Sequence, residues 1–211
     1  ESLNQAPEAI ELSGSSLDEN SEAGAFVANL TAVDADNTEG AVFELTGAGT
    51  QLFEIAGTQL VVKDGAVLDF EDRSQLPVEI TVTDASGNSY TQTVTIDLND
   101  INETPLLDSA AFDVDEADYV YNSELHAVDQ DLNDQLTFVV EDGFVLPAGF
   151  ELAADGGYSF DPADPAYDHL SQGDSQIITV PVTVADSGGL ESSAQIRITI
   201  NGTNDIPVAG A

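Results

Sequence analysis

Oxygen-bearing side chains crowd the segment Asp97–Pro105, which lies between two strand-like stretches. Hard oxygen donors at this density suit Ca²⁺, which takes roughly 6–8 oxygen ligands at about 2.3–2.6 Å. A linker that binds calcium is stiff with the ion and loose without it, so the segment indicates a mechanical or adhesive role rather than catalysis. The side chains concerned are those of Asp97, Asn99, Asp100, Asn102 and Glu103.

Pairs of carboxylates separated by one residue recur elsewhere in the chain. On an extended backbone such a pair projects to one side, about 7 Å apart, so both members can reach one ion or bracket two. A single aspartate at a turn is more often a solvated cap, but here motifs from separate segments indicate the same chemistry. The pairs are Asp34/Asp36, Asp69/Glu71 and Asp129/Asp131, and Asp18-Glu19-Asn20 is a further acidic motif.

The chain as a whole is strongly acidic. Its 211 residues include 40 acidic and 3 basic side chains, for a formal charge of −37. This charge excludes DNA, RNA and anionic lipid as partners, because these need Lys or Arg, and it favours cations. A salt-adapted, solvated surface is the alternative, but it does not explain why the acids cluster in motifs. Hydrophobic residues make up 42% of the chain, which is enough for packed cores.

Cysteine, methionine and tryptophan are absent. Disulfides and thiolate metal sites are therefore impossible, and bound metal is the obvious staple for an extracellular protein of this kind. The sequence shows neither a signal peptide nor an apolar run of membrane length, so we expect no direct membrane insertion. Because it starts and stops within linker-like sequence, we expect a fragment of a longer repeat array.

Apolar and polar residues alternate in short runs, which is the periodicity of β-strands. Val78–Thr83, Tyr90–Leu98 and Ile196–Ile200 alternate most clearly. Turn signals such as Asp64-Gly65 and Ser187-Gly188-Gly189 separate the runs. Together these features predict an all-β fold made of Greek-key β-sandwiches.

An internal repeat of roughly 100 residues, about one sandwich domain, divides the chain. We therefore predict two similar domains, 1–102 and 103–211, joined by the short calcium-binding linker. The matching segments are Thr81–Gly87 with Thr183–Gly189, Ala32–Asp36 with Ala127–Asp131, and Asn99-Asp100 with Asn204-Asp205.

The acidic motifs of the first domain, taken in order, resemble the cadherin repeat. That family carries a Glu-Asn near its first strand, an Asp-x-Asp after its second, a Leu-Asp-x-Glu between its middle strands, an Asp before its last hairpin, and an Asp-x-Asn-Asp-Asn linker. Each motif is weak alone, but five in the right order form a strong signal. The corresponding residues are Glu19-Asn20, Asp34-Ala35-Asp36, Leu68-Asp69-Phe70-Glu71, Asp84 and Asp97-Leu98-Asn99-Asp100.

The second domain is more similar to the cadherin-related VCBS-type repeats of large bacterial RTX adhesins. The resemblance rests on Asp155–Pro162, Leu170–Asp174 and Ile200–Pro207. It implies a bacterial surface protein, located outside the cell.

The resemblance also implies a site for two or three Ca²⁺ ions where the domains meet. Ile101 stands where the family linker has Asn, so its carbonyl would serve, and Asn102 or Glu103 would be a substitute ligand. The expected ligands are Glu19, Asp69 and Glu71 from the first domain, Asp97, Leu98, Asn99, Asp100, Ile101 and Asn102 from the linker, and Asp129, Asp131 and Asp186 from the second domain.

Two half sites are expected at the outer ends of the pair. Asp34, Asp36 and Asp84 form the N-terminal one, which we expect to be empty or weak without a preceding domain. The second domain lacks the Leu-Asp-x-Glu motif, so its C-terminal half site would use Glu116, Asp161 and Asp205.

Catalytic and other calcium motifs fit the sequence poorly. Asp129–Asn133 mimics the start of an EF-hand loop, but position six is Asp134 and position twelve is Val140, where Gly and Glu are needed. The two histidines, His126 and His169, have no nucleophile elbow to serve. We therefore expect no enzyme activity.

The expected function is that of a calcium-rigidified extender or adhesion module of a large bacterial surface adhesin. The alternatives are a direct carbohydrate- or protein-binding module, including homophilic adhesion, and a spacer region of a secreted enzyme. Neighbouring repeats of the same chain are the expected partners, with a host or cell-surface glycan or protein as a further one. The chain itself is expected to be monomeric.

Overall fold

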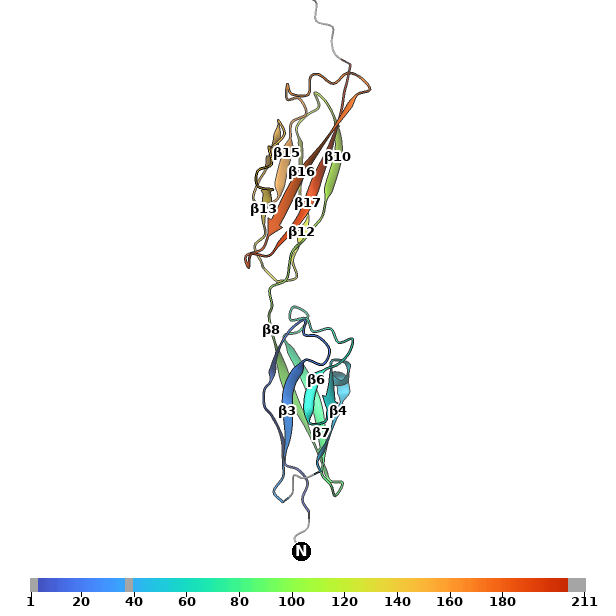
Figure 1. Ribbon diagram of the computed structural model, residues 1–211, viewed down its shortest axis with the longest axis vertical. Coiled ribbons are helices and arrows are strands. Elements are labelled where there is room, and N and C mark those ends of the chain that lie inside the picture. Colours follow the sequence, from blue (N-terminus) through green and yellow to red (C-terminus); the bar gives the residue numbers. More distant parts are fainter. Residues whose placement is uncertain (1–3, 37–39, 205–211) are drawn as a thin grey trace, which may run out of the picture. The chain divides into compact units, whose positions relative to one another are not determined.

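The computed structural model describes residues 4–36 and 40–204, and the chain divides into two compact units, Glu1–Ile101 and Asn102–Ala211. Both units are built from β-strands (Figure 1), which confirms the predicted all-β fold of tandem sandwich domains. In the described residues the only helix is the short 3-10 helix η1 (Gly47–Gln51). No helix there has the length and apolar character needed to cross a membrane.

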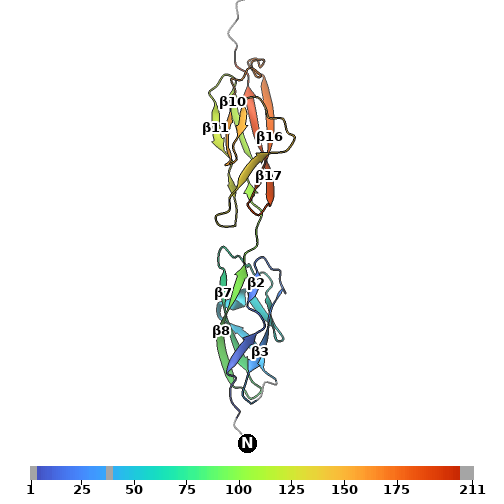
Figure 2. The same ribbon diagram turned by 90° about the vertical axis from the view of Figure 1, so that its left-hand side faces the viewer.

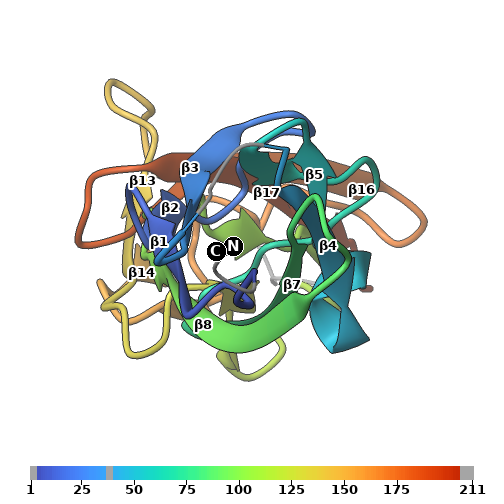
Figure 3. The same cartoon turned by 90° about the horizontal axis from the view of Figure 1, so that it is seen from below.

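Unit 1 consists of two four-stranded sheets. One sheet has the order β1-β3-β6-β5 and the other the order β2-β8-β7-β4. Figure 3 shows β3 and β5 on one side of this unit and β7 and β8 on the other. The strands are β1 (Ala9–Leu12), β2 (Ser16–Asp18), β3 (Phe26–Val33), β4 (Val42–Thr46), β5 (Phe53–Ala56), β6 (Gln59–Val62), β7 (Gln75–Thr83) and β8 (Ser89–Asn99).

The core of unit 1 lies between these sheets and follows the alternation of the strands. In β7, every second residue from Leu76 to Val82 is buried, while the residues between them face outward. Burial of such a stripe supplies the main stabilising free energy, about 25 cal/mol per Å² of apolar surface. The buried residues of the other sheet include Phe53, Leu60 and Val62.

Unit 2 has one four-stranded sheet of order β10-β17-β16-β13, a three-stranded sheet β11-β15-β14 and a short pair β12-β9. Ile196, Ile198 and Ile200 of β17 are fully buried and face the aromatic residues of the smaller sheet in one core. The strands are β9 (Leu106–Leu107), β10 (Ala110–Asp115), β11 (Tyr121–Glu124), β12 (Ala127–Val128), β13 (Thr137–Val140), β14 (Phe150–Leu152), β15 (Gly157–Phe160), β16 (Ser175–Ala185) and β17 (Glu191–Asn201).

The last strand of each unit pairs in parallel with an early strand, as Figure 2 shows for β2 beside β8. Asp18 lies opposite Asn99 in unit 1, and Asp115 lies opposite Asn201 in unit 2. Two sequence expectations are corrected by this register. β8 runs through Asn99, so the first third of the predicted linker is strand, and Asn99 corresponds to Asn201 rather than to Asn204.

Candidate metal sites

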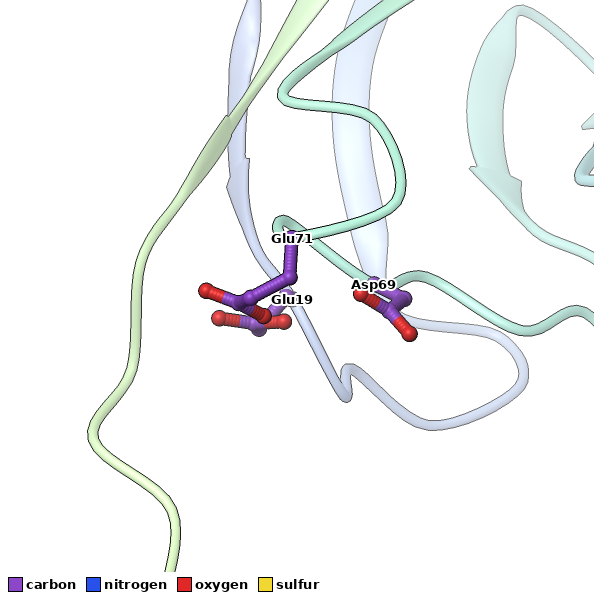
Figure 4. A group of neighbouring side chains, drawn as sticks. All are labelled: Glu19, Asp69 and Glu71. Carbon is purple, nitrogen blue, oxygen red and sulfur yellow. The ribbon is translucent and has the colours of Figure 1, made fainter. Parts of the chain in front are cut away.

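Three carboxylates converge at the C-terminal end of unit 1. Oxygen atoms of Glu19, Asp69 and Glu71 all lie within 4.8 Å of one another. Glu19 follows β2, whereas Asp69 and Glu71 come from the loop between β6 and β7 (Figure 4). The sequence expected these three residues to act together, and the fold brings them together.

Glu19 ties the C-terminal strand to this loop. Its side chain is only 2% exposed. One carboxylate oxygen accepts the N–H of Ile101 at 2.9 Å, and the other accepts the N–H of Phe70 at 2.8 Å. A change in the position of Glu19 is therefore transmitted directly to the backbone that leaves unit 1.

Asp100 adds a fourth carboxylate to this end of the unit. A carboxylate oxygen of Asp100 lies within 4.8 Å of one of Glu71. Asp69 also accepts the N–H of Asp72 at 2.8 Å, which fixes the loop that carries it. The group therefore contains acidic oxygens from three separate segments.

Asp97 and Asn99, two of the expected linker ligands, make hydrogen bonds within unit 1. Both lie on the exposed face of β8, while Leu98 between them is 4% exposed and packs in the core. The Asp97 carboxylate accepts a hydrogen bond from Gln75 at 2.9 Å, and the Asn99 amide donates to Asp18 at 2.8 Å. The group of carboxylates described above does not include Asp97.

A second group lies at the N-terminal end of unit 2. Oxygen atoms of Asp129, Asp131 and Asp134 lie within 4.8 Å of one another. The N–H of Asp131 donates to Asp129 at 3.0 Å, and the N–H of Glu103 donates to Asp131 at 2.8 Å. The Asp-x-Asp pair is thus locked to the backbone that enters this unit.

Asn102 joins the same end of unit 2 through its side chain. Its amide donates to Asp186 at 2.8 Å, and the other Asp186 oxygen accepts the N–H of Leu190 at 2.8 Å. A Cβ atom at Gly188 would lie 2.1 Å from the Asn102 side-chain oxygen. Glycine at 188 therefore makes room for the approach of Asn102.

The N-terminal end of unit 1 repeats this design. The Asn4 amide donates to Asp84 at 2.6 Å. The N–H of Gln5 donates to Asp36 and that of Asp36 to Asp34, each at 3.0 Å. The residues expected as an N-terminal half site therefore form a hydrogen-bond network of their own, equivalent to the one that holds Asp129, Asp131 and Asp186 in unit 2.

Sequence reasoning missed Asn4 and Asp134 in these networks. A sequence signal for the asparagine exists, because Asn-x-x-Pro occurs at 4–7, 102–105 and 204–207. No comparable signal marks Asp134, which reaches its group through a turn with Asn133 at a positive φ of 70°.

The surroundings shift the pKa values of the aspartates in opposite directions. Burial, together with the nearby Asp131, Asp134 and Asp186, raises the pKa of Asp129. Burial also acts to raise the pKa of Asp84, but hydrogen bonds from Asn88, Asn4 and Ser86 outweigh it and lower that pKa. The raised pKa of Asp129 thus has burial as its main cause and the neighbouring carboxylates as further causes.

The C-terminal end of unit 2 differs from that of unit 1. Glu116, 6% exposed, accepts the N–H of Thr203 at 2.7 Å with one oxygen, and its other oxygen is buried without a hydrogen-bond partner. Asp161 accepts the N–H of Ala163 at 3.0 Å. Asp205 lies outside the described residues. No group of three carboxylates forms at this end within the described part of unit 2.

Basic side chains do not balance these acidic groups. In residues 4–36 and 40–204 the ion pairs are Arg73 with Asp72 at 3.3 Å and His126 with Asp108 at 3.0 Å. Two like charges 4 Å apart repel by about 1 kcal/mol in water and about 4 kcal/mol near a protein surface. A donor set made only of oxygens, with this unbalanced charge, fits Ca²⁺.

Residues 14–99 match the sequence profile of the cadherin domain. This span covers the Glu19 and Asp69/Glu71 motifs as well as the Asp34/Asp36 pair and Asp84. No match was found among curated protein sequences.

Solved structures of cadherin extracellular repeats share the fold of this chain. Human protocadherin-24 EC1-2 has a TM-score of 0.67 at 19% identity, over 95% of this chain and 100% of that one. Mouse cadherin-23 EC22-24 has a TM-score of 0.59 at 18% identity, over 93% and 64%. The protocadherin gammaB7 EC3-6 cis-dimer structure has a TM-score of 0.60 at 19% identity, over 93% and 51%.

The chain thus spans 51% of the protocadherin gammaB7 chain and 35% of a protocadherin gammaB4 chain that it also resembles. At these identities the likeness is one of fold. Residues 14–99 match the cadherin domain profile, and the chain folds as tandem cadherin-like β-sandwiches.

Proposed function

We propose that this chain is an extracellular, non-enzymatic extender or adhesion module in which two or three Ca²⁺ ions link its two units. The ions would bind to Glu19, Asp69, Glu71 and Asp100 of unit 1 and to Asp129, Asp131, Asp186 and Asn102 of unit 2. Bound calcium would then fix the linker between the units, and calcium removal would free it.

The observation that carries this proposal is the group around Glu19. Three carboxylates from two segments approach within 4.8 Å, and one of them is 2% exposed. Bringing one buried and two partly buried carboxylates together is unfavourable unless positive charge offsets their repulsion. Divalent cations are the partners that an all-oxygen set selects.

Calcium would also stabilise each folded unit, because it binds the assembled carboxylates and not the unfolded chain. Calcium at about 100 times its Kd would add about 2.7 kcal/mol per independent site. An extracellular chain without cysteine has no disulfide to provide such support.

Small-angle X-ray scattering with calcium and with EDTA tests the proposal. The expected result is a narrow distribution of maximum dimensions in calcium and a broader one in EDTA. Asp100→Ala should show the EDTA behaviour even in calcium, whereas Asp142→Ala, at an exposed loop position, should behave like the unchanged chain. Identical profiles with and without calcium would contradict the proposal.

Location on a bacterial surface is part of the proposal and rests on the VCBS-like segments of unit 2. We further propose that the isolated chain is a monomer whose main partners are neighbouring repeats. One similar structure is described as a cis-dimer. Sedimentation in calcium distinguishes the two states, since a dimer would favour homophilic adhesion over a spacer role.

A further inference from the structure

The C-terminal ends of the two units share one backbone plan. The N–H of Glu19 donates to the Asn99 carbonyl at 3.1 Å, and that of Glu116 donates to the Asn201 carbonyl at 2.9 Å. Both glutamates are buried, at 2% and 6% exposure. Counting onward from this register, Gly202 occupies the position of Asp100.

Gly202 has no space for a side chain. A Cβ atom at this position would lie 2.2 Å from the Ser171 carbonyl oxygen and 2.8 Å from its carbon, a contact that real Cβ atoms do not make. The Gly202 N–H donates to the Asp174 carbonyl at 2.9 Å. The position that carries a carboxylate in unit 1 is therefore covered by backbone in unit 2.

The covering segment is residues 161–174, which we name the cap segment. Tyr167 and Leu170 anchor it in the core, at 3% and 6% exposure. The Tyr167 hydroxyl donates to the Ala148 carbonyl at 2.8 Å. At the C-terminal end of the cap segment, the N–H of Asp174 donates to the Ser171 carbonyl at 2.8 Å and forms a turn.

In unit 2, the cap segment occupies the position that the acidic loop with Asp69 and Glu71 has in unit 1. The residue after each buried glutamate has a positive φ, 55° at Asn20 and 65° at Ala117. Their N–H groups donate to the carbonyls of Leu68 (3.0 Å) and Pro162 (3.5 Å) respectively. With Pro162 in the place of Leu68, the next positions hold Ala163 and Pro165 where unit 1 has its two acids.

We propose that the cap segment does at the C-terminal end of unit 2 what calcium does at that of unit 1. Hydrogen bonds to Asp174 and Glu116 and the buried Tyr167 and Leu170 hold residues 201–203 in place without metal. Withdrawal of calcium would then loosen the backbone that leaves unit 1 and spare the backbone that leaves unit 2. The contrast rests on the proposed calcium role of unit 1.

Residue-resolved amide exchange of the whole chain, measured by NMR in calcium and in EDTA, tests this inference. The N–H groups of Ile101 and Phe70, both bonded to Glu19, should exchange about tenfold faster in EDTA. Those of Gly202 and Thr203 should exchange at nearly unchanged rates. Faster exchange at Gly202 and Thr203 in EDTA would overturn the inference, because it would show a metal bound there, for instance to the second oxygen of Glu116.

A substitution separates the cap segment from the effect of metal. Gly202→Ala should speed exchange at Thr203 about tenfold, both in calcium and in EDTA, because the cap segment must move away from the new methyl group. Gly14→Ala is the matched control, since its Cβ would meet only the Val27 carbonyl at 3.5 Å. Unchanged exchange at Thr203 in Gly202→Ala would contradict the role given to the cap segment.

A second, milder variant tests the cap segment even if Gly202→Ala does not fold. Tyr167→Phe keeps the buried ring and removes only the bond to Ala148, so exchange at Thr203 should rise severalfold in both conditions. If EDTA leaves amide exchange at Ile101 and Phe70 unchanged while exchange at Gly202 and Thr203 is as expected, the calcium proposal is contradicted. The role of the cap segment is then still supported.

Discussion

At the scale of single residues, Glu19 is the side chain that joins three segments at the C-terminal end of unit 1. It contributes a carboxylate to the acidic group and accepts two backbone N–H groups, from Phe70 and Ile101. Under the proposed function, metal binding and backbone order would therefore depend on one buried carboxylate.

Glu19→Gln should weaken calcium binding about tenfold, which corresponds to about 1.4 kcal/mol. The amide removes one negative charge and turns an N–H donor toward one of the two backbone donors that the carboxylate accepts. Calorimetric titration with calcium measures the change, and Glu8→Gln, at an exposed position, is the control. Equal affinity in both variants would contradict a ligand role for Glu19.

Asn102 is also important as a single residue, through a hydrogen bond within unit 2 rather than through metal. Asn102→Ala leaves a buried Asp186 oxygen without its donor, because Asp186 is 7% exposed. The expected loss of unfolding free energy is about 1–3 kcal/mol, seen in urea unfolding in EDTA so that metal does not contribute. Asn122→Ala, which removes an exposed bond to Val120, should cost less than half as much; equal losses would argue against the Asp186 contact.

At the scale of elements, the alternation of β8 decides which linker residues can act together. Asp97 and Asn99 point to the exposed face because Leu98 fills the core, and they pair with Gln75 and Asp18. Only Asp100, beyond the end of the strand, is free of this alternation and can approach Glu71. Strand geometry thus places Asp97 and Asn99 on the exposed face, while Asp100 lies near Glu71.

Two buried tyrosines of unit 2, Tyr158 on β15 and Tyr167 in the cap segment, create a pH dependence of stability at alkaline pH. Burial raises the pKa of Tyr158 and of Tyr167 above the ordinary value of 10.0. Because their folded-state pKa is raised, their contribution to stability is full below about pH 10 and falls as the pH rises toward the folded-state values.

Thermal unfolding in EDTA between pH 8 and pH 11 checks this prediction. Loss of unit 2 packing should begin above about pH 10, together with the appearance of tyrosinate absorbance. Tyr158→Phe and Tyr167→Phe together should make the melting temperature less sensitive to pH in this range. A melting temperature that stays constant to pH 11 in the unchanged chain would contradict it.

At the scale of the whole molecule, the formal charge of −37 opposes folding through self-repulsion. Screening shortens the range of that repulsion, since the Debye length falls from about 30 Å at 0.01 M salt to about 10 Å at 0.1 M. Monovalent salt and calcium should therefore both stabilise the chain, by different means.

In EDTA, raising KCl from 0.01 to 0.5 M should raise the melting temperature. The further gain from calcium should be largest at low salt and should persist at 0.5 M, because ligand bonds to the ion are screened less than surface charges. Differential scanning calorimetry across a salt series measures both effects. If calcium no longer raises the melting temperature at 0.5 M KCl, its effect is only general screening of charge and not binding at a site.

The sequence predicts the parts of the site whose residues are close together in the chain better than the parts that a turn or a strand register brings together. The Asp69/Glu71 and Asp129/Asp131 pairs were found from local spacing, because both members lie on one loop or strand end. Asp134 was missed because a positive φ at Asn133 turns the chain back toward the pair. Asn99 was matched to Asn204 through the shared Asn-Asp pair, whereas the spacing from Thr81–Gly87 and Thr183–Gly189 leads to Asn201, as the register of β17 against β10 also indicates.

The sequence by itself determined the all-β class, the two-fold repeat and the chemistry of the acidic motifs, since strand alternation, turn residues and donor type are local properties. The tertiary structure decided which carboxylates meet and which backbone closes each unit. Glu19 reaches Asp69 and Glu71, and the Ser171 carbonyl excludes a side chain at 202, because packing brings distant segments into contact. Such contacts depend on the fold as a whole and cannot be deduced from any short stretch of the chain.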